Sequence, residues 1–533
     1  MARSPLAARL IDTLRLALSF DRRNLSVAEG LERRDEARHR RDLSRRALLA
    51  LGASTAACAA ASVVARAPTA PRPLASLSGA RVAVVGAGIA GLTAAWRLKQ
   101  AGASPVVYDA SGRTGGRAFT LRDHFPVKCE LGGELIDTGH RQIRALVAEL
   151  GLSLVDLREA AANTEPERYV LDAVRYTEAQ MLDAFRSLVP AIRRDLEAVG
   201  DAPITHAHFT PTAESLDALS LGSWLERNGV RGPLRALLEV AFVSELGREP
   251  YELNALSFLY TIGRDTDRLA LYGSSDERFS VREGSDAIAA RLATRLGAAV
   301  VLSHRLAAVR ARDDGAVTLS FEVGASTRDV VADRVVLALP FNQLRRCELA
   351  LEMPVAKRRA IQELAYGTNA KVMISTRSRP WRDGGASGTS FSDGGVYHES
   401  WETTRGYAGE VAVMTSYTGG RLGVSVGESN PEAQGRRFAE ALDAVFPGTA
   451  MAFTGRAARM HWPSARYFEG SYACYGPGDW TRIAGAEATP VGPVFFAGEH
   501  TSAESPGFMN GAVESGERAA REVIASARQG ARA

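Results

Sequence analysis

One stretch in the first quarter of the chain constrains its fold more than any other feature. Residues 80–85 read ARVAVV, a short β-branched run suited to a buried parallel strand. The next six residues, GAGIAG at 86–91, have glycine at the first, third and sixth positions, and the helix-like run LTAAWRLKQAG follows. This order of strand, glycine turn and helix is the dinucleotide-binding pattern of a βαβ unit. The sequence therefore predicts an α/β fold that holds a nucleotide at this turn.

Each glycine of the turn has a physical role that a larger residue cannot take. Gly86 permits the tight turn, Gly88 lets the backbone approach a diphosphate, and Gly91 lets the helix pack on the strand. The diphosphate is expected at the positive end of the helix dipole, beside Ile89 and Ala90.

A second strand-like run, PVVYDA at 105–110, supplies an acid for the same nucleotide. Asp109 lies 23 residues after Gly86 and is followed by Ala110, and an acid at this spacing can accept hydrogen bonds from ribose hydroxyls. A second glycine turn, ASGRTGGRAFT, then brings in Arg117. NAD sites do not usually need this cation, whereas the diphosphate of an extended FAD can use it, so we expect FAD.

Beyond these two turns, the chain resembles the flavin-containing amine oxidase family over roughly residues 77–527. Four stretches carry the resemblance in the family's order: ELGGELID at 130–137, HRLAAVRARDDGAVTLSFE at 304–322, ADRVVLALP at 332–340, and VFFAGEHTSAESPGFMNGAVESGERAAREV at 494–523. The first resembles the segment that passes the flavin ring, and the last resembles the returning C-terminal motif. The resemblance implies these further flavin contacts: Gly132, Gly133, Glu134, Leu135, Val309, Gly498, Glu499, Gly507, Met509 and Asn510.

The resemblance also implies an α/β architecture in which an FAD-binding Rossmann-type domain is interleaved with an α+β substrate-binding domain. Residues 77–150, 281–345 and 461–527 are expected to form the FAD-binding domain, and the insertions 151–280 and 346–460 the substrate-binding domain.

Local patterns give the insertions and one hairpin a predicted structure. Asp314-Gly315 is a good hairpin signal within the FAD-binding pieces. The first insertion reads as helical, with a capping box from Thr177 to Gln180 before an apolar stripe that we assign to the core. The second insertion contains strand-like runs, namely AKVMIST, VYHESW and EVAVMTSY.

Three residues are the candidates for chemistry, on the strength of the resemblance. Lys371, in YGTNAKVMIST, matches the lysine that in this family holds a water against flavin N5. The alternative for Lys371 is a solvent-facing position on a strand. Tyr472 and Phe508 match the two walls of the family's aromatic cage, which directs an amine toward N5. Either ring taken alone could belong to the core instead.

The flavin is expected to be bound non-covalently, and no metal site is expected. Some family members attach FAD to a cysteine just before the cage tyrosine, but that position here is Ser471, and Cys474 is three residues out of register. None of the four cysteines, Cys58, Cys129, Cys347 and Cys474, belongs to a CxxC pair.

The substrate class remains open between an amine and an amino acid. Some L-amino acid oxidases place a carboxylate-binding arginine where this chain has Leu135. Glu134 has two readings of equal weight: it pairs with a distal cation of the substrate, or it hydrogen-bonds the chain or the ribityl region. Glu245 is expected to be a solvated or capping residue, and Arg248 could bind a carboxylate, which would restore the amino-acid reading.

Near its start the chain carries a feature of exported proteins. SRRALL at residues 44–49 resembles a twin-arginine signal and precedes a weakly apolar, Ala-rich stretch. Residues 1–76 are therefore expected to be a leader recognised by the twin-arginine export machinery, with a periplasmic or extracellular destination. The alternative is a buried or anchoring helix.

Charge excludes one class of partner. Residues 1–70 contain 13 arginines and 7 acidic residues, so they account for more than the whole net charge of +4. The remaining chain is slightly acidic, and we expect no nucleic acid partner. Whether the chain forms a homodimer is left open.

We therefore expect an FAD-dependent amine oxidase that converts a primary amine to an imine, which hydrolyses to an aldehyde and ammonia. Dioxygen is the expected acceptor and hydrogen peroxide the product. An L-amino acid oxidase for basic side chains is the nearest alternative. A desaturase-type flavoprotein needs neither the cage nor Lys371, and a flavin-bound binding module without turnover would not need them either.

Overall fold

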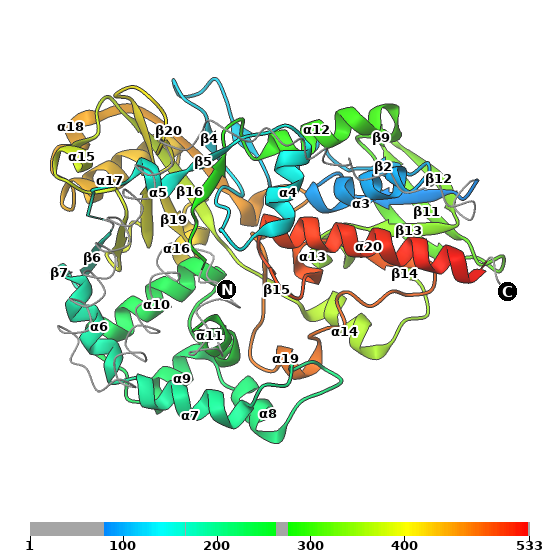
Figure 1. Ribbon diagram of the computed structural model, residues 1–533, viewed down its shortest axis with the longest axis horizontal. Coiled ribbons are helices and arrows are strands. Elements are labelled where there is room, and N and C mark those ends of the chain that lie inside the picture. Colours follow the sequence, from blue (N-terminus) through cyan, green and yellow to red (C-terminus); the bar gives the residue numbers. More distant parts are fainter. Residues whose placement is uncertain (1–78, 166, 263–274, 531–533) are drawn as a thin grey trace, which may run out of the picture.

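A computed structural model of the protein describes residues 79–165, 167–262 and 275–530 (Figure 1). The predicted leader and its twin-arginine motif lie outside these described residues. Within the described ranges, no helix combines the length and the apolar character that crossing a membrane requires.

A five-stranded parallel sheet carries the nucleotide-binding turn. Its order is β22-β13-β1-β2-β9, in which all neighbours run parallel. The strands are β1 (Val82–Val85), β2 (Val106–Tyr108), β9 (Val300–Val301), β13 (Arg334–Leu337) and β22 (Val494–Phe496). All five come from the three pieces expected to bind FAD, although they are scattered along the chain.

Alternating side chains of this sheet reach two different cores. Val82 and Val84 pack with helices α3 (Ile89–Gln100) and α20 (Met509–Gly530), which lie side by side on one face (Figure 1). Ala83 and Val85 pack on the other face, against a second sheet. Burial on both faces explains why β1 is apolar throughout.

The second sheet has the order β12-β11-β10-β14 and contains the predicted hairpin. Its strands are β10 (Arg305–Ala311), β11 (Val317–Val323), β12 (Ser326–Ala332) and β14 (Glu348–Ala350). β10 and β11 pair antiparallel around Gly315, whose φ of 77° requires a left-handed conformation. The hairpin prediction is confirmed.

A seven-stranded sheet forms the frame of the half that is expected to bind the substrate, with the order β20-β16-β19-β18-β17-β6-β7. It comprises β6 (Arg168–Leu171), β7 (Val174–Tyr176), β16 (Ala370–Thr376), β17 (Ser390–Ser392), β18 (Glu399–Glu402), β19 (Ala412–Thr418) and β20 (Phe453–His461). The expectation that the first insertion is helical was incomplete, because β6 and β7 belong to it. β6 pairs with β17 of the second insertion, a long-range contact with no local signal.

Helices of the first insertion build a separate apolar core below this sheet in Figure 1. They are α6 (Glu178–Arg186), α7 (Val189–Val199), α8 (Pro211–Asp217), α9 (Leu221–Arg227), α10 (Gly232–Leu246) and α11 (Ala255–Ile262). Thr177 and Gln180 form the predicted capping box at the start of α6. The apolar stripe that follows is buried, as expected.

The remaining helices and strands complete the fold. They are β3 (Thr120–Leu121), β4 (Cys129–Glu130), α4 (Arg141–Glu149), β5 (Leu154–Asp156), α5 (Leu157–Ala160), β8 (Phe279–Val281), α12 (Asp286–Leu296), α13 (Phe341–Leu344), α14 (Val355–Glu363), β15 (Ala365–Tyr366), α15 (Pro380–Asp383), α16 (Gly420–Ser425), α17 (Pro431–Asp443), α18 (Thr449–Ala452), β21 (Ala473–Cys474) and α19 (Asp479–Arg482).

Candidate active site

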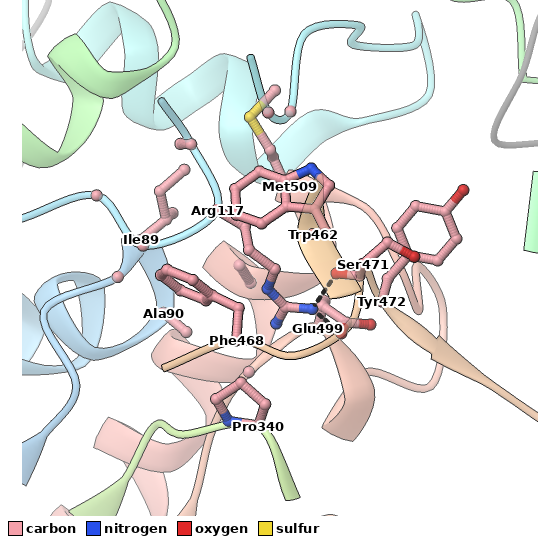
Figure 2. A pocket seen from close by; sticks show the side chains of 18 of the residues that line it. Ile89, Ala90, Arg117, Pro340, Trp462, Phe468, Ser471, Tyr472, Glu499 and Met509 are labelled. Carbon is pink, nitrogen blue, oxygen red and sulfur yellow. Dashed lines mark hydrogen bonds and ion pairs between the residues drawn. The ribbon is translucent and has the colours of Figure 1, made fainter. Parts of the chain in front are cut away.

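One cavity of about 230 Å³, partly open to solvent, collects residues from both halves of the molecule (Figure 2). Its lining includes the two glycine turns, residues 132–135, one face of the seven-stranded sheet, residues 467–472 and the start of α20. Segments separated by hundreds of residues therefore meet at a single place.

Most of the predicted site residues lie in this lining. They are Gly86, Gly88, Ile89, Ala90, Asp109, Ala110, Arg117, Gly132, Gly133, Glu134, Leu135, Lys371, Tyr472, Gly498, Glu499, Gly507, Phe508 and Met509. The structure thus brings the predicted catalytic residues together with the predicted cofactor-binding residues.

Gly91, Val309 and Asn510 do not line the cavity. A Cβ at Gly91 would lie 1.9 Å from the carbonyl oxygen of Gly86, so this glycine lets α3 approach the turn. Val309 is fully buried within β10. Asn510 accepts a hydrogen bond from the backbone N–H of Ile143 and ties α20 to α4. The flavin contacts expected of Val309 and Asn510 stay predictions.

The first glycine turn leaves room for a ligand against its backbone. Gly88 caps α3 without any side-chain hydrogen bond, and a Cβ built on it would meet no atom within 4 Å. Ile89 and Ala90 open the helix and line the cavity. The uncapped N–H groups of a first helical turn, beside open space, form the arrangement that binds a diphosphate.

Asp109 stabilises this turn from the end of β2. Its two carboxylate oxygens accept the N–H groups of Ala87 at 2.6 Å and Ser111 at 2.8 Å, and burial raises its pKa. A carboxylate has about four lone-pair positions, so it keeps the capacity to accept from ribose hydroxyls. With the open turn at Gly88, the residues present fit a dinucleotide such as FAD.

Arg117 links the second glycine turn to the C-terminal motif (Figure 2). Its Nη1 donates to the carbonyl oxygen of Ser471 at 2.6 Å and forms an ion pair of 2.9 Å with Glu499. The other oxygen of Glu499 accepts the N–H of Gly507 at 2.8 Å, just before α20. Arg117 therefore lines the cavity with its charge already compensated by Glu499.

Lys371, Tyr417 and Glu399 form one row across the neighbouring strands β16, β19 and β18. Lys371 is opposite Tyr417, and Tyr417 is opposite Glu399. Directly opposed residues share one face of a sheet, and this face contributes to the cavity. The Tyr417 hydroxyl lies 2.8 Å from that of Tyr472, which connects the row to the predicted cage.

Lys371 is buried, with 5% of its surface exposed, so the solvent-facing alternative is wrong. Its ammonium donates to the carbonyl oxygens of Glu130 at 3.1 Å and Gly132 at 3.0 Å, and to the carboxylate of Glu134 at 2.8 Å. Protein acceptors thus engage all three N–H groups of the ammonium. The water-holding role stays a prediction.

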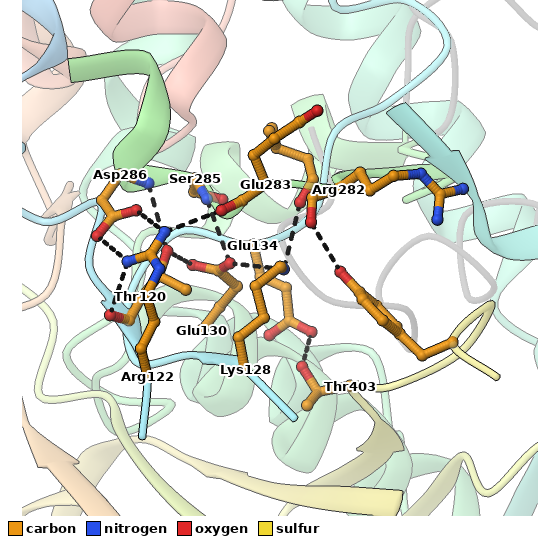
Figure 3. Close-up of polar contacts among 12 residues, drawn as sticks. Thr120, Arg122, Lys128, Glu130, Glu134, Arg282, Glu283, Ser285, Asp286 and Thr403 are labelled. Carbon is orange, nitrogen blue, oxygen red and sulfur yellow. Dashed lines mark hydrogen bonds and ion pairs between the residues drawn. The ribbon is translucent and has the colours of Figure 1, made fainter. Parts of the chain in front are cut away.

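Glu134 is bound on both of its oxygens. One pairs with Lys371, and the other accepts from the indole N–H of Trp401 at 3.1 Å and from the hydroxyl of Thr403. Figure 3 shows the contact with Thr403. Of the two readings of Glu134, the structure shows the one in which the carboxylate bonds to the protein.

A second buried acid, Glu130, lies next to the Lys371–Glu134 ion pair and stabilises the backbone that contacts it (Figure 3). Its carboxylate accepts from the Thr120 hydroxyl at 2.8 Å and from the Ser285 N–H at 3.2 Å, and Lys128 lies 3.6 Å away. Burial raises the pKa of Glu130 to about 7. These contacts hold β4, whose carbonyl at Glu130 positions Lys371.

The two predicted cage residues both line the cavity but have different surroundings. Tyr472 is tied by its hydroxyl to Tyr417. Phe508 packs edge-on against His140, with ring centroids 4.8 Å apart. Burial lowers the pKa of His140 to about 4, so this ring is neutral at neutral pH. One wall is therefore polar at its tip and the other is apolar.

The structure places two charged residues of the first insertion, Glu245 and Arg248. Glu245 is fully buried in α10, so the expectation of a solvated or capping residue was wrong. Arg248 pairs with Glu252 at 3.2 Å and does not line the cavity. Neither position could be read from the sequence, because burial of an acid follows from packing between distant elements.

Sequence reasoning missed several lining residues. Among them are one acid and five aromatic residues: Glu277, Trp401, Tyr417, Trp462, Tyr467 and Phe468. None stands in a motif with mechanistic spacing. For Trp401 and Tyr417, the available signal was that they lie in the strand-like runs VYHESW and EVAVMTSY. These runs did not indicate which face of each strand would line the cavity.

Comparisons with known proteins agree with this geometry. The family model described as "Flavin containing amine oxidoreductase" matches residues 89–524. A Mycobacterium tuberculosis protein named as a flavin-containing monoamine oxidase is 28% identical over 451 residues, covering 83% of this chain and 96% of that protein. The flavin-containing amine oxidase of Oncorhynchus mykiss is 25% identical over 468 residues, covering 83% and 85%.

Solved structures give the same picture. Putrescine oxidase bound to putrescine superposes with a TM-score of 0.71 at 25% identity, covering 84% of this chain and 99% of that one. Cyclohexylamine oxidase from Brevibacterium oxydans, at 24% identity, has a TM-score of 0.73 with the same coverage and shows the shared fold.

Proposed function

Since this chain belongs to the family of flavin-containing amine oxidoreductases, we propose that its substrate is a primary amine without an α-carboxylate. It is an FAD-dependent amine oxidase. FAD, when bound, would accept two electrons as a hydride equivalent from the α-C–H bond of the amine, which becomes an imine. We propose dioxygen as the final acceptor and hydrogen peroxide as the product.

One observation carries the choice of amine over amino acid. Among the described residues, the cations that line the cavity are Arg117 and Lys371, and each is ion-paired with a buried acid. A substrate carboxylate would have to compete with Glu499 or Glu134 for these partners. A neutral amine between Tyr472 and Phe508 needs no such exchange. The residues that line the cavity can therefore bind and orient an amine, but they do not provide a site for a substrate carboxylate.

The proposal is tested with two pairs of compounds that differ only by the α-carboxylate. These are agmatine against L-arginine and pentylamine against L-norleucine, with peroxide release as the measurement. We expect at least one amine to be oxidised at a kcat/KM at least about tenfold above that of its amino acid. Turnover of the amino acids alone would contradict the proposal.

We further propose that FAD is held without a covalent bond. Ser471 occupies the position of the linking cysteine, and its hydroxyl donates to Asn369 at 2.6 Å. No cysteine or histidine lines the cavity in the part of the chain that the structure describes. Acid precipitation of the purified protein is expected to release all flavin into the supernatant, measured by absorbance. A yellow pellet would show a covalent link.

Export by the twin-arginine route is proposed from the sequence motif alone, because residues 44–49 lie outside the described ranges.

A further inference from the structure

Four carboxylates line the cavity, and three have clear partners. Glu134 pairs with Lys371, Glu499 pairs with Arg117, and Asp109 accepts two backbone N–H groups. The fourth, Glu277, is 7% exposed, and neither of its oxygens has a hydrogen-bond partner. A buried carboxylate without a partner is costly and calls for a counter-charge.

The surroundings of Glu277 increase this cost. Glu399, Asp137 and Glu245 repel its negative charge, and Arg405 is the nearby cation that offsets it. Burial and this repulsion hold the pKa of Glu277 well above its usual range. Its φ of 42° is a left-handed conformation that a non-glycine residue adopts at a cost. The acid is therefore held in place against both electrostatic and conformational preference.

One of these acids, Glu399, lies close to the predicted cage. Glu399 stands directly opposite Tyr417 on the neighbouring strand, so their Cβ atoms are about 5 Å apart. Tyr417 in turn contacts Tyr472 through its hydroxyl. Glu277, whose charge interacts with that of Glu399, lines the same cavity. A short chain of contacts thus leads from the cage to a group of acidic side chains that includes Glu277.

We propose that Glu277 binds a second cationic group of the substrate, an ammonium or guanidinium carried a few carbons away from the amine that is oxidised. This inference rests on the proposed function and specifies the substrate class as diamines and related dications. The cation supplies the missing hydrogen-bond donors and stabilises the ionised form of Glu277. Glu277 is then a specificity-determining residue, and not one that takes part in the chemistry.

The test compares two amines of nearly equal shape in the holoenzyme. In 1,4-diaminobutane an ammonium replaces the terminal methyl group of pentylamine. We expect the wild-type kcat/KM for the diamine to exceed that for pentylamine by about 10- to 100-fold, the range of a hydrogen bond to a charged group. In Glu277→Gln this preference should largely disappear, with the loss confined to the diamine.

A matched control and a stability measurement separate recognition from structure. Glu283→Gln removes an acid on the same segment that does not line the cavity, and it should keep the diamine preference. Because glutamine cannot ionise, Glu277→Gln removes the electrostatic penalty attached to this buried acid, and its Tm should rise or stay equal. A lower Tm with both amines impaired equally would assign Glu277 a structural role and overturn the proposal.

The cation site at Glu277 and the amine oxidase activity are distinguished by different results. If pentylamine and 1,4-diaminobutane are oxidised equally well by the wild type, the cation site is wrong and the amine oxidase stands. If only amino acids are oxidised, the proposed function itself fails.

A pH profile adds an independent readout. The groups facing Glu277 are Glu399, Asp137, Glu245 and Arg405. The diamine binds the ionised form of Glu277, so its KM should fall as pH rises through the raised pKa of this group. The KM for pentylamine should lack that component, and so should the KM for the diamine in Glu277→Gln. An identical profile for both amines in the wild type would contradict the assignment.

Discussion

A Gly88→Ala variant is expected to fold with unchanged stability and to bind FAD about 5- to 150-fold more weakly. The added methyl group meets no protein atom within 4 Å, and Gly88 has a φ of −75°, which alanine adopts freely. The methyl group instead occupies the space where the diphosphate approaches the backbone, and overpacking of this kind costs about 1–3 kcal/mol. FAD titration of the apoprotein, followed by flavin fluorescence, measures the affinity, and thermal unfolding of the apoprotein measures the stability.

Gly91→Ala is the matched control, since the same methyl group is added three residues along the same turn. There it would lie 1.9 Å from the carbonyl oxygen of Gly86, a backbone atom that cannot move aside cheaply. This variant should lose stability in the apoprotein itself. If Gly88→Ala retained wild-type FAD affinity, the assignment of this turn to the diphosphate would be wrong.

Lys371→Met is expected to lower the free energy of unfolding by about 3–5 kcal/mol, which is the cost of removing one partner from a buried ion pair. The substitution leaves the Glu134 carboxylate charged and buried, with only Trp401 and Thr403 as donors. It also removes the donor to two carbonyl groups. Urea unfolding at neutral pH measures the change.

The double variant Lys371→Met/Glu134→Gln should recover more than half of this loss, because it no longer buries an unpaired charge. Glu134→Gln alone should also destabilise, since it leaves the Lys371 ammonium without its counter-charge. Additive effects of the two single changes would mean that the ion pair contributes no coupling energy. Activity should stay low in the double variant, which separates the role of Lys371 in the site from its contribution to folding.

The sequence alone predicted the nucleotide-binding half well, because its signals are local. The signals are a β-branched strand, glycines at fixed positions, and an acid that lies 23 residues after the first glycine. Each of them fixes the backbone conformation of a short stretch of chain. The hairpin at Gly315 and the capping box at Thr177 were confirmed for the same reason. The family assignment and the flavin followed from motifs that keep their order along the chain, and the comparisons confirm both.

The partners of charged residues were decided only by the tertiary structure. Glu134 and Lys371 are 237 positions apart and meet because β16 lies against residues 130–134. Glu245 was expected in solvent and is buried, and Glu277 stands in no motif at all. Whether an acid is buried, and with which residue it pairs, depends on which distant elements pack together. The sequence around an acid does not indicate this. The sequence by itself thus determined the fold class and the flavin through local motifs, and it indicated the reaction through its resemblance to a known family. The long-range packing of strands and helices decided which acids are neutralised and which one is left for a substrate.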